Sequence, residues 1–315
     1  MTLTQLRTFL AVAETASVRA AAERLVVSQP SVSAAVACLE REVGVALVAR
    51  HGRGLRVTEA GAAFAVRVRQ SLGMLESAVR CARSLEAPGQ GSVHVVTVTT
   101  AAERLLPPLL AVFRHQHPDA GVAVQVGNRS TVWEALRDHT ADLVIAGRPP
   151  PTAPAVVLAT APNQLVLVGP PTGGGTAPEG GATTGKVSVP VVALAEQTWL
   201  LREAGSGTRD ATNQLLADLG IDPPTMILGS NGAVEQAVVA GLGIALISLD
   251  AVADRIAAGT AAAWDCPGTP LDRPWHLVAH ASAALSPTAL LLARSMTEVP
   301  DRFELTDEGR RALAP

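Results

Sequence analysis

Apolar residues in the first part of the chain recur at the intervals of three short helices. Within 4–14 they stand three or four positions apart, which predicts a first helix. Ser17 can cap a second helix and Ser28 a third, and Gly44 can end the third. Three short helices, with polar residues near the start of the third, are typical of a helix-turn-helix unit.

Two β-prone segments follow within 48–58 and flank a tip rich in glycine and arginine, which predicts a hairpin wing. A continuous helical pattern then runs from Thr58, a candidate cap, to about Leu85. Its apolar stripe consists of Phe64, Val68, Leu72, Leu75, Val79 and Ala82. We expect this stripe to pack against a partner helix, and packing on its own domain is the alternative.

Beyond 88–91, short apolar segments alternate with helical ones. The predicted strands are 93–98, 122–126, 143–145, 165–168, 199–202, 225–229, 244–247 and 275–280. The predicted helices are 102–115, 132–139, 208–219, 233–240 and 287–296. This alternation predicts a parallel sheet with helices on both faces, so the overall class is α/β. The segment 170–185, rich in glycine, proline and threonine, is expected to be a surface loop, and we assign it no function.

Length and charge suggest that different parts of the chain have different roles. The 315 residues are about twice the usual single-domain length, which favours at least two folded units. Residues 1–86 hold 11 arginines and 7 glutamates, a balance of +4, so the rest must carry −7 to give the net charge of −3. A basic first segment on an acidic body suits a protein whose first segment contacts a polyanion.

Several classes of function are disfavoured. No apolar run reaches the roughly 18 residues that span a bilayer, and the N-terminus begins with a polar, helix-like pattern, so we expect a cytoplasmic protein without membrane contact. Cys38, Cys81 and Cys266 match no metal-ligand spacing, so we expect neither disulfides nor a metal. No catalytic or nucleotide-binding motif stands out, so we expect no enzyme and no cofactor.

The N-terminal motifs closely resemble those of LysR-type transcriptional regulators. The residues that carry the resemblance are Leu6-Arg7-Thr8-Phe9, Ala21-Ala22-Glu23-Arg24-Leu25, Ser28-Gln29-Pro30-Ser31-Val32-Ser33, Leu39-Glu40 and Thr58-Glu59-Ala60-Gly61. The resemblance implies a winged helix-turn-helix, a dimerising linker helix and a two-lobed α/β effector domain related in fold to periplasmic solute-binding proteins. It also implies a homodimer or homotetramer that binds double-stranded DNA at a dyad-symmetric promoter site.

The resemblance divides the chain into three parts. The implied DNA-binding domain is 1–58, the linker helix 59–87 and the effector-binding domain 88–315. Within the effector-binding domain, one lobe comprises about 91–161 and 268–300, and the other about 162–267. The chain would cross between the lobes near 160–164 and 266–274.

In the arrangement that the family implies, the first residues of the third helix enter the major groove. The expected DNA-binding residues are Ser28, Gln29, Pro30, Ser31 and Ser33 on this helix and Arg50, Arg53 and Arg56 on the wing. Many relatives carry a long polar or basic residue just after the serine equivalent to Ser33, whereas this chain has Ala34-Ala35. We therefore expect fewer base contacts from this turn.

Motifs in the second half are similar to those of the CbbR branch, regulators of carbon-fixation genes that respond to phosphorylated or otherwise anionic metabolites. The motifs are Gly127-Asn128-Arg129, Ala146-Gly147-Arg148-Pro149-Pro150, Arg202-Glu203-Ala204-Gly205-Ser206-Gly207-Thr208-Arg209 and Gly229-Ser230-Asn231. They follow predicted strands, where the carboxyl ends of strands and the N-termini of helices suit an anionic ligand.

These motifs and a further strand end predict an effector site. The expected effector-binding residues are Thr99, Thr100, Asn128, Arg129, Arg148, Arg202, Ser206, Thr208, Arg209, Ser230 and Asn231. The expected effector is a small, anionic molecule bound between the two lobes. For Ser206, Thr208 and Thr100, a role as plain helix caps is the alternative.

The competing hypothesis is a solute-binding protein or an enzyme built on the second half alone. A polar N-terminus argues against the first version, and the lack of a nucleophile, base and metal constellation argues against the second.

The end of the chain carries one further motif. Phe303 to Gly309 echoes the expected wing-to-linker junction at Leu55 to Gly61. We attribute this echo to chance or to a short appended tail.

Overall fold

The computed structural model describes residues 1–52, 54–87, 89–171 and 187–314. The chain forms two compact units, one of Met1–Val79 with Arg137–Thr140 and the other of Arg80–Leu136 with Ala141–Pro315. Most of the expected 170–185 loop lies outside the described residues. In the part of the chain that is described, no helix is both long and apolar enough to cross a membrane.

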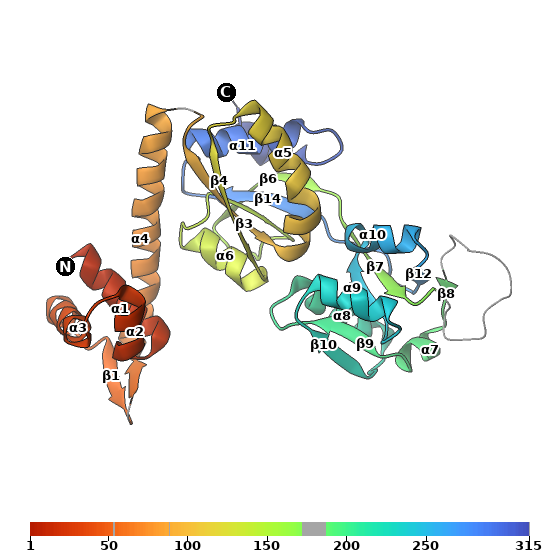
Figure 1. Cartoon of the computed structure of the whole chain (residues 1–315), viewed down its shortest axis with the longest axis horizontal. Helices are drawn as coiled ribbons and strands as arrows, with labels where there is room; N and C mark the ends of the chain where they lie inside the picture. The colour runs from red at the N-terminus through yellow and green to blue at the C-terminus, as the bar shows by residue number, and fades with distance from the viewer. Residues whose placement is uncertain (53, 88, 172–186, 315) are drawn as a thin grey trace. The chain divides into compact units, whose positions relative to one another are not determined.

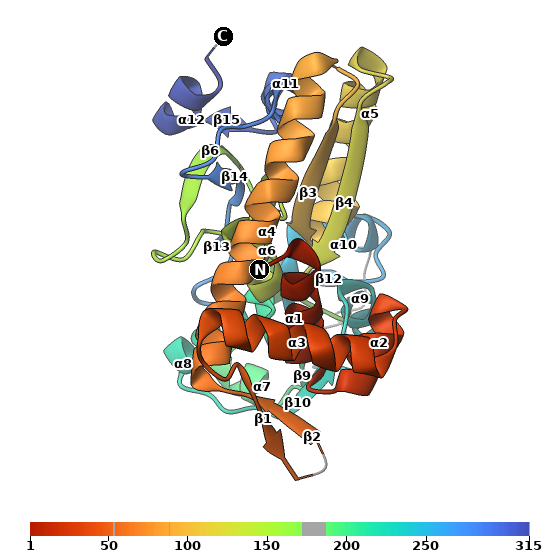
Figure 2. The ribbon, with the colours of Figure 1, turned by 90° about the vertical axis from the view of Figure 1, so that its left-hand side faces the viewer.

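The first unit is a cluster of helices with a hairpin (Figure 2). Its elements are α1 (Leu3–Thr15), α2 (Val18–Leu25), α3 (Gln29–Val43), β1 (Val48–His51), β2 (Gly54–Val57) and α4 (Glu59–Glu86). Ser17 and Ser28 cap α2 and α3 through their side chains, and Gly44 ends α3 with a φ of 80°. The three predicted helices are present as α1 to α3, and the antiparallel pairing of β1 and β2 confirms the predicted wing.

The apolar stripe of α4 divides into two parts. Val68 and Leu72 are buried in the core of the first unit, where they pack with Phe9 of α1. Leu75 and Val79 lie further along α4 and are each 51% exposed. The expectation of a partner helix is therefore wrong for the first part of the stripe, because α4 buries the apolar face of its own helix cluster. For the second part, a partner helix stays a prediction.

The second unit contains two α/β parts, which we call lobe I and lobe II (Figure 1). Lobe I is built on a six-stranded sheet in the order β15-β6-β14-β5-β3-β4. Its strands are β3 (Ser92–Val98), β4 (Gly121–Gly127), β5 (Leu143–Ala146), β6 (Ala155–Ala161), β14 (Trp275–His280) and β15 (Glu304–Leu305). β3 runs parallel to β4 and β5, whereas each pairing of β6, β14 and β15 is antiparallel.

Helices cover both faces of this sheet. One face is buried by α11 (Pro287–Glu298) and by α5 (Leu106–Gln116), which continues the π-helical turn η1 (Ala101–Leu105). The other face is buried by α6 (Arg129–Arg137). The predicted α/β class is therefore confirmed. The expectation of a parallel sheet is only partly right, because the chain returns from lobe II and adds antiparallel strands.

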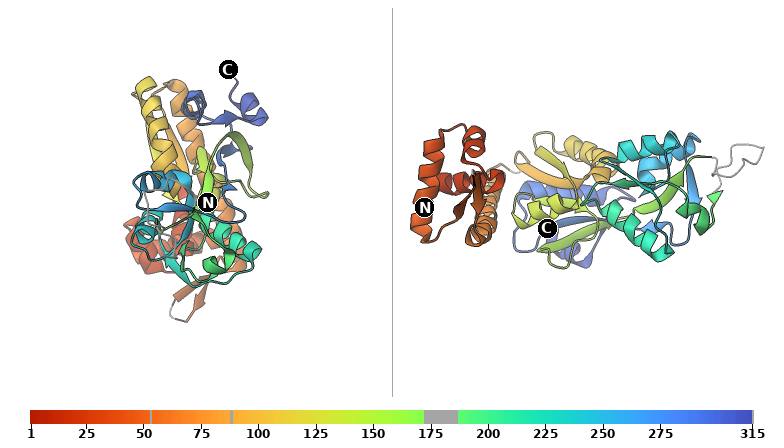
Figure 3. Two further views of the ribbon diagram at one scale, coloured as in Figure 1. Left: turned by 90° about the vertical axis from the view of Figure 1, so that its right-hand side faces the viewer. Right: turned by 90° about the horizontal axis from the view of Figure 1, so that it is seen from below.

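Lobe II is organised in the same way, with strands between helices (Figure 3). Its larger sheet contains β11 (Ala245–Ser248), β7 (Gln164–Gly169), β12 (Ala262–Asp265) and β8 (Val187–Ser188), with β13 (Leu271–Asp272) beside β7. A separate parallel pair is formed by β9 (Trp199–Arg202) and β10 (Thr225–Leu228). Its helices are α7 (Val191–Ala195), α8 (Gly207–Leu219), α9 (Asn231–Val239) and α10 (Leu249–Ala257). α8 packs on one side of the strands, and α9 and α10 pack on the other.

The end of the chain is part of lobe I. β15 pairs with β6, and α12 (Asp307–Ala312) follows it. Thr306 donates its hydroxyl to the carbonyl of Val157 and its amide to the carbonyl of Leu158, and its hydroxyl oxygen accepts from the amide of Gly309. The expectation of a short appended tail is therefore wrong, because this segment supplies an edge strand of the sheet.

The same arrangement joins the wing to α4. Thr58 donates its hydroxyl to the carbonyl of Ala46 and its amide to the carbonyl of Leu47, and it accepts from the amide of Gly61. Gly61 lies directly on the second carbonyl, since an added Cβ would stand 2.0 Å from the Leu47 oxygen. The two motifs therefore form the same local hydrogen-bond pattern.

Gly309→Ala is expected to destabilise the protein by about 1–3 kcal/mol. The added Cβ would lie 1.7 Å from the carbonyl oxygen of Leu158, so the backbone of α12 or β6 would have to move. Thermal or urea unfolding measures the change. Gly232→Ala in α9 is the matched control, because a Cβ there meets no atom within 4 Å. Equal stability of the Gly309 variant and the wild type would contradict the packing at this glycine.

Candidate functional site

The start of α3 presents a polar surface. The exposed residues are Ser28, Gln29, Pro30, Ser31 and Ser33. Val32 and Val36 lie on the other side of the helix and are buried in the first unit. Every residue that the sequence predicted on this helix therefore lies on its accessible first turns, where a helix that reads a DNA groove carries its contacts.

The hairpin adds positive charge to this unit. Arg50 and Arg56 are both exposed on it, whereas Arg53 lies outside the described residues. Glu40 of α3 accepts a hydrogen bond from the amide of Leu47 at 2.8 Å, which ties the base of the hairpin to the helix. The base of the wing is thereby bonded to the last turns of α3.

A cavity of about 350 Å³ lies between lobes I and II. The carboxyl ends of β3, β4, β5 and β9 open onto it, together with the first turn of α8. Eight of the predicted effector-binding residues line it: Thr99, Thr100, Asn128, Arg129, Arg148, Arg202, Ser206 and Thr208. Arg209, Ser230 and Asn231, also predicted, lie outside the lining.

The polar groups near the cavity differ in whether they cap helices. Ser230 and Asn128 accept hydrogen bonds from amides in the first turns of α9 and α6 and are caps. Ser206 and Thr100 precede α8 and η1 without a side-chain cap bond, and Thr208 lies inside α8. Ser206 and Thr100 therefore occupy N-cap positions but do not cap through their side chains, and the helix-cap alternative is wrong for Thr208.

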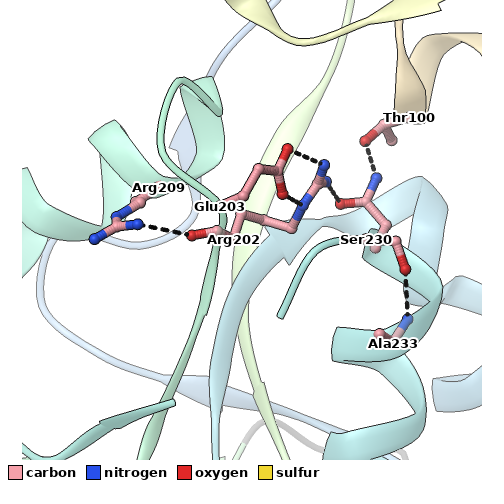
Figure 4. A network of polar contacts seen from close by, with 7 residues as sticks. Thr100, Arg202, Glu203, Arg209, Ser230 and Ala233 are labelled. Atoms are coloured by element: carbon pink, nitrogen blue, oxygen red, sulfur yellow. Dashed lines mark hydrogen bonds and ion pairs between the residues drawn. The ribbon is translucent and has the colours of Figure 1, made fainter. Parts of the chain in front are cut away.

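A polar network runs from lobe II to lobe I beside the cavity (Figure 4). Arg202, at the end of β9 and 8% exposed, donates from Nε to Oε2 of Glu203 at 2.8 Å and from Nη2 to Oε1 at 2.9 Å. Its Nη1 donates to the side-chain oxygen of Asn231. Asn231 in turn donates from Nδ2 to Oγ1 of Thr100 at 2.5 Å, and Thr100 belongs to lobe I. Arg209 donates to the main-chain carbonyl of Arg202 at 3.4 Å.

The lobes also meet through the backbone. The amide of Arg129 in lobe I donates to the carbonyl of Gly205 in lobe II at 3.2 Å. Gly205 has a φ of 85°, and an added Cβ would lie 3.1 Å from Nδ2 of Asn128. Glycine suits this position both because of its backbone conformation and because lobe I comes so close.

Positive charge exceeds negative charge among the lining residues. The arginines are Arg129, Arg148, Arg202 and Arg273, and the carboxylates are Glu203 and Asp272. Burial disfavours the charged form of Glu203, but hydrogen bonds from Arg202 and the nearby guanidinium charges outweigh burial and lower its pKa. Glu203 is therefore ionised at neutral pH.

His276 is the histidine of the lining. Burial lowers its pKa, and the charge of Arg148 acts in the same direction, against a backbone hydrogen bond at Pro274. The imidazole is therefore neutral at neutral pH, and the excess of positive charge comes from arginine. Among the described residues, no group of three His, Cys, Asp or Glu side chains is placed to hold a metal ion.

Asn163 connects the two segments that pass between the lobes. Its Nδ2 donates to the carbonyl of Arg273 at 2.7 Å, and its own carbonyl accepts from the Arg273 amide at 2.9 Å. Its Oδ1 accepts from the hydroxyl of Ser248 at 2.6 Å. Asn163 is 7% exposed, and its bond to Ser248 is buried.

Sequence reasoning missed five polar or charged residues that the structure places at the cavity: Glu203, Asn163, Asp272, Arg273 and His276. Glu203 stands inside the quoted Arg202–Arg209 motif, so the signal was present and only its role was not considered. Asn163, Asp272 and Arg273 fall within the expected crossings. His276 belongs to β14, and its position beside the cavity depends on the pairing of that strand with β5.

Asn163→Ala is expected to destabilise the second unit by about 1–3 kcal/mol, because it leaves buried polar groups at both crossings without partners. Differential scanning calorimetry measures the loss. Gln164→Ala is the control, since Gln164 also bonds across the crossings, from Nε2 to Asp272, but at an exposed position. If the two variants lose the same stability, the central role of Asn163 is refuted.

Two family models match the chain. The model described as "Bacterial regulatory helix-turn-helix protein, lysR family" matches residues 3–62. The model described as "LysR substrate binding domain" matches residues 86–301. Together they cover both units of the structure.

Curated proteins give the same picture. The chain is 36% identical over 290 residues to the HTH-type transcriptional regulator CfxR of Cupriavidus necator, covering 92% of this chain and 89% of that protein. It is 33% identical over 288 residues to the HTH-type transcriptional regulator CbbR of Rhodospirillum rubrum, covering 91% and 93%. The expected similarity to the CbbR branch is confirmed.

Two solved structures are also similar. The regulatory domain of Synechocystis PCC6803 CcmR, in complex with 2-PG, matches with a TM-score of 0.58 and 26% identity over 67% of this chain and 98% of that one. Full-length CbnR complexed with its target DNA matches with a TM-score of 0.62 and 23% identity over 94% and 98%, a likeness of fold.

Proposed function

Because this chain belongs to the LysR family of DNA-binding transcriptional regulators, we propose that it controls transcription from a specific promoter in response to a small anionic metabolite. The observation that carries the proposal is the cavity between lobes I and II, where arginines outnumber carboxylates at the ends of strands. Family membership also removes the alternatives of a transport protein and an enzyme: the protein is a transcriptional regulator.

For DNA, we propose that the first turns of α3 enter the major groove and that the wing contacts the backbone. Gln29 has the side-chain amide that reads a base edge, and the hydroxyls of Ser31 and Ser33 suit bases or phosphates. Arg50 and Arg56 supply charge for phosphate or the adjacent minor groove. The exposure of all five residues supports this assignment.

We propose that the protein acts as a homodimer or homotetramer on a dyad-symmetric site. The exposed second part of the α4 stripe, with Leu75 and Val79 half exposed, suits the pairing of two linker helices. Pairing would place two reading helices on one DNA duplex. Because its partner is DNA, we propose a cytoplasmic location.

For the effector, we propose that the cavity binds a phosphorylated or carboxylated metabolite. Arg129 and Arg148 contribute cationic groups from lobe I, and the uncapped first turn of α8 contributes amide groups from lobe II. A relative whose regulatory domain was solved in complex with 2-PG supports a small ligand for this type of domain. A ligand that contacts both lobes would change their angle and so alter DNA binding.

Gln29→Ala is expected to weaken binding to the operator by roughly 5- to 150-fold, the loss of one good base contact.

Arg50→Ala should weaken specific and non-specific binding alike and reduce the dependence of affinity on salt. Electrophoretic mobility shifts at fixed salt with competitor DNA, on the DNA just upstream of its own gene, measure both effects.

The control for these variants is Gln214→Ala on α8, far along the chain from the helix-turn-helix. If wild type gives no specific shift on this DNA, a genome-wide binding selection should identify the operator. If Gln29→Ala binds the selected operator as tightly as wild type, the proposed reading helix is wrong.

Arg148→Ala is expected to reduce the affinity for anionic effectors by roughly tenfold or more, because it removes a charged hydrogen-bond donor from the cavity. Thermal-shift and calorimetric screens of phosphosugars, nucleotides and uncharged aromatic compounds would find the ligand class. Arg302→Ala, an exposed substitution outside the cavity lining, changes the net charge equally and should have no effect. Binding of uncharged aromatics while every anion fails would refute an anionic effector.

A further inference from the structure

Arg202 is a buried cation that already has an anionic partner. Its guanidinium and the carboxylate of Glu203 form two parallel hydrogen bonds of 2.8 and 2.9 Å, the two-pronged geometry that also binds carboxylate or phosphate groups of ligands. Both side chains line the cavity in which the effector is proposed to bind. Glu203 therefore fills a position that the charged group of a ligand would fill.

The two partners differ in how firmly the protein holds them. The Arg202 side chain is 9% exposed, whereas that of Glu203 is 34% exposed. The segment after Glu203 contains Gly205, whose φ is 85°, and leads into α8. Arg202 is the less exposed of the two and extends from the end of β9, whereas the carboxylate of Glu203 is partly exposed to solvent. The carboxylate is therefore the partner that can be exchanged.

The third contact of Arg202 leads to the other lobe. Its Nη1 donates to Asn231, which is 1% exposed, and Asn231 donates to Thr100 of lobe I. Figure 4 shows Glu203 and this path on different sides of the same guanidinium. A change of anion at Arg202 therefore acts on a group whose partner, Asn231, bonds across the interface of the lobes.

We propose that Glu203 is an internal counter-anion: it neutralises Arg202 while no effector is bound, and the phosphate or carboxylate of the effector displaces it. Glu203 would thereby lower the affinity for every anionic ligand that has to displace it. It would select ligands whose charged group forms stronger hydrogen bonds with Arg202 than the Glu203 carboxylate does. The inference rests on the proposed function, because it requires an anionic ligand in this cavity.

The test compares Glu203→Gln with wild type in the full chain and uses inorganic phosphate as the probe at constant ionic strength. Without phosphate, the variant is expected to have a lower Tm, because Arg202 loses its counter-charge while it stays buried. Phosphate should restore the Tm of the variant and should bind it roughly tenfold or more tightly than wild type by calorimetry. Glu196→Gln, an equal change of charge at an exposed residue outside the cavity lining, is the control.

Glu203→Asp provides a second comparison, because it keeps the charge but shortens the side chain that forms both hydrogen bonds. If Glu203 acts by occupying Arg202, the aspartate variant should bind phosphate more tightly than wild type. If it acts only by repelling anions, the aspartate variant should match wild type and the inference fails.

Other results of these measurements would overturn either this inference or the proposed anionic effector. A lower Tm of Glu203→Gln with unchanged phosphate affinity would make the ion pair purely structural and overturn the inference. An unchanged Tm with tighter phosphate binding would indicate repulsion alone and overturn it as well. If phosphate fails to bind wild type and both variants, while an uncharged compound binds wild type, the anionic effector itself is refuted. If phosphate binds wild type and Glu203→Gln with equal affinity, only the role of Glu203 as an internal counter-anion is refuted.

Discussion

An arginine keeps its charge at any pH that a cell reaches, so Arg202 needs an anion or strong acceptors wherever it is buried. In this protein it lies at the end of β9 with 8% exposure and is held by Glu203 and Asn231. The first partner is ionised and accessible from the cavity, and the second reaches Thr100 in the other lobe. One buried charge thus connects the cavity with the contact between lobes.

The connection between lobes depends on how lobe I is assembled. Its sheet is completed by β14 and β15, which come after the whole of lobe II in the chain. Two segments must therefore pass side by side between the lobes, and Asn163 joins them through its side chain and its backbone. A ligand in the cavity would act on a pair of lobes whose connecting segments are hydrogen-bonded to each other.

The end of α4 is built into the second unit. Arg80 of α4 forms an ion pair with Asp142 at 3.1 Å, with side chains 13% and 8% exposed. The hydroxyl of Ser84 lies 2.6 Å from that of Thr288, at the start of α11, and also accepts from the Thr288 amide. Movement within lobe I would therefore displace the end of α4. Because α4 is the linker helix, the proposed effector response has a physical route along it.

Local rules accounted for much of this molecule in advance. Caps at Ser17 and Ser28, the end of α3 at Gly44 and the strands with continuous apolar sequence follow from backbone hydrogen bonding and side-chain periodicity, which neighbouring residues decide. Short elements such as α7 and β13 escaped because few residues carry their pattern. The motif at Thr306 was visible too, but only pairing of β15 with β6 shows that it is structural.

The candidate site likewise has a part that the sequence predicted and a part that it did not. From the sequence alone came the helix-turn-helix with its exposed polar residues, and the set of strand ends that line the cavity, because parallel strands end at a common edge. Only the tertiary structure decided which apolar positions of α4 face its own unit, which hydroxyls are helix caps, and that Glu203 neutralises Arg202. These depend on which residues far apart in the chain lie within a few ångströms of each other, and local sequence does not encode that distance.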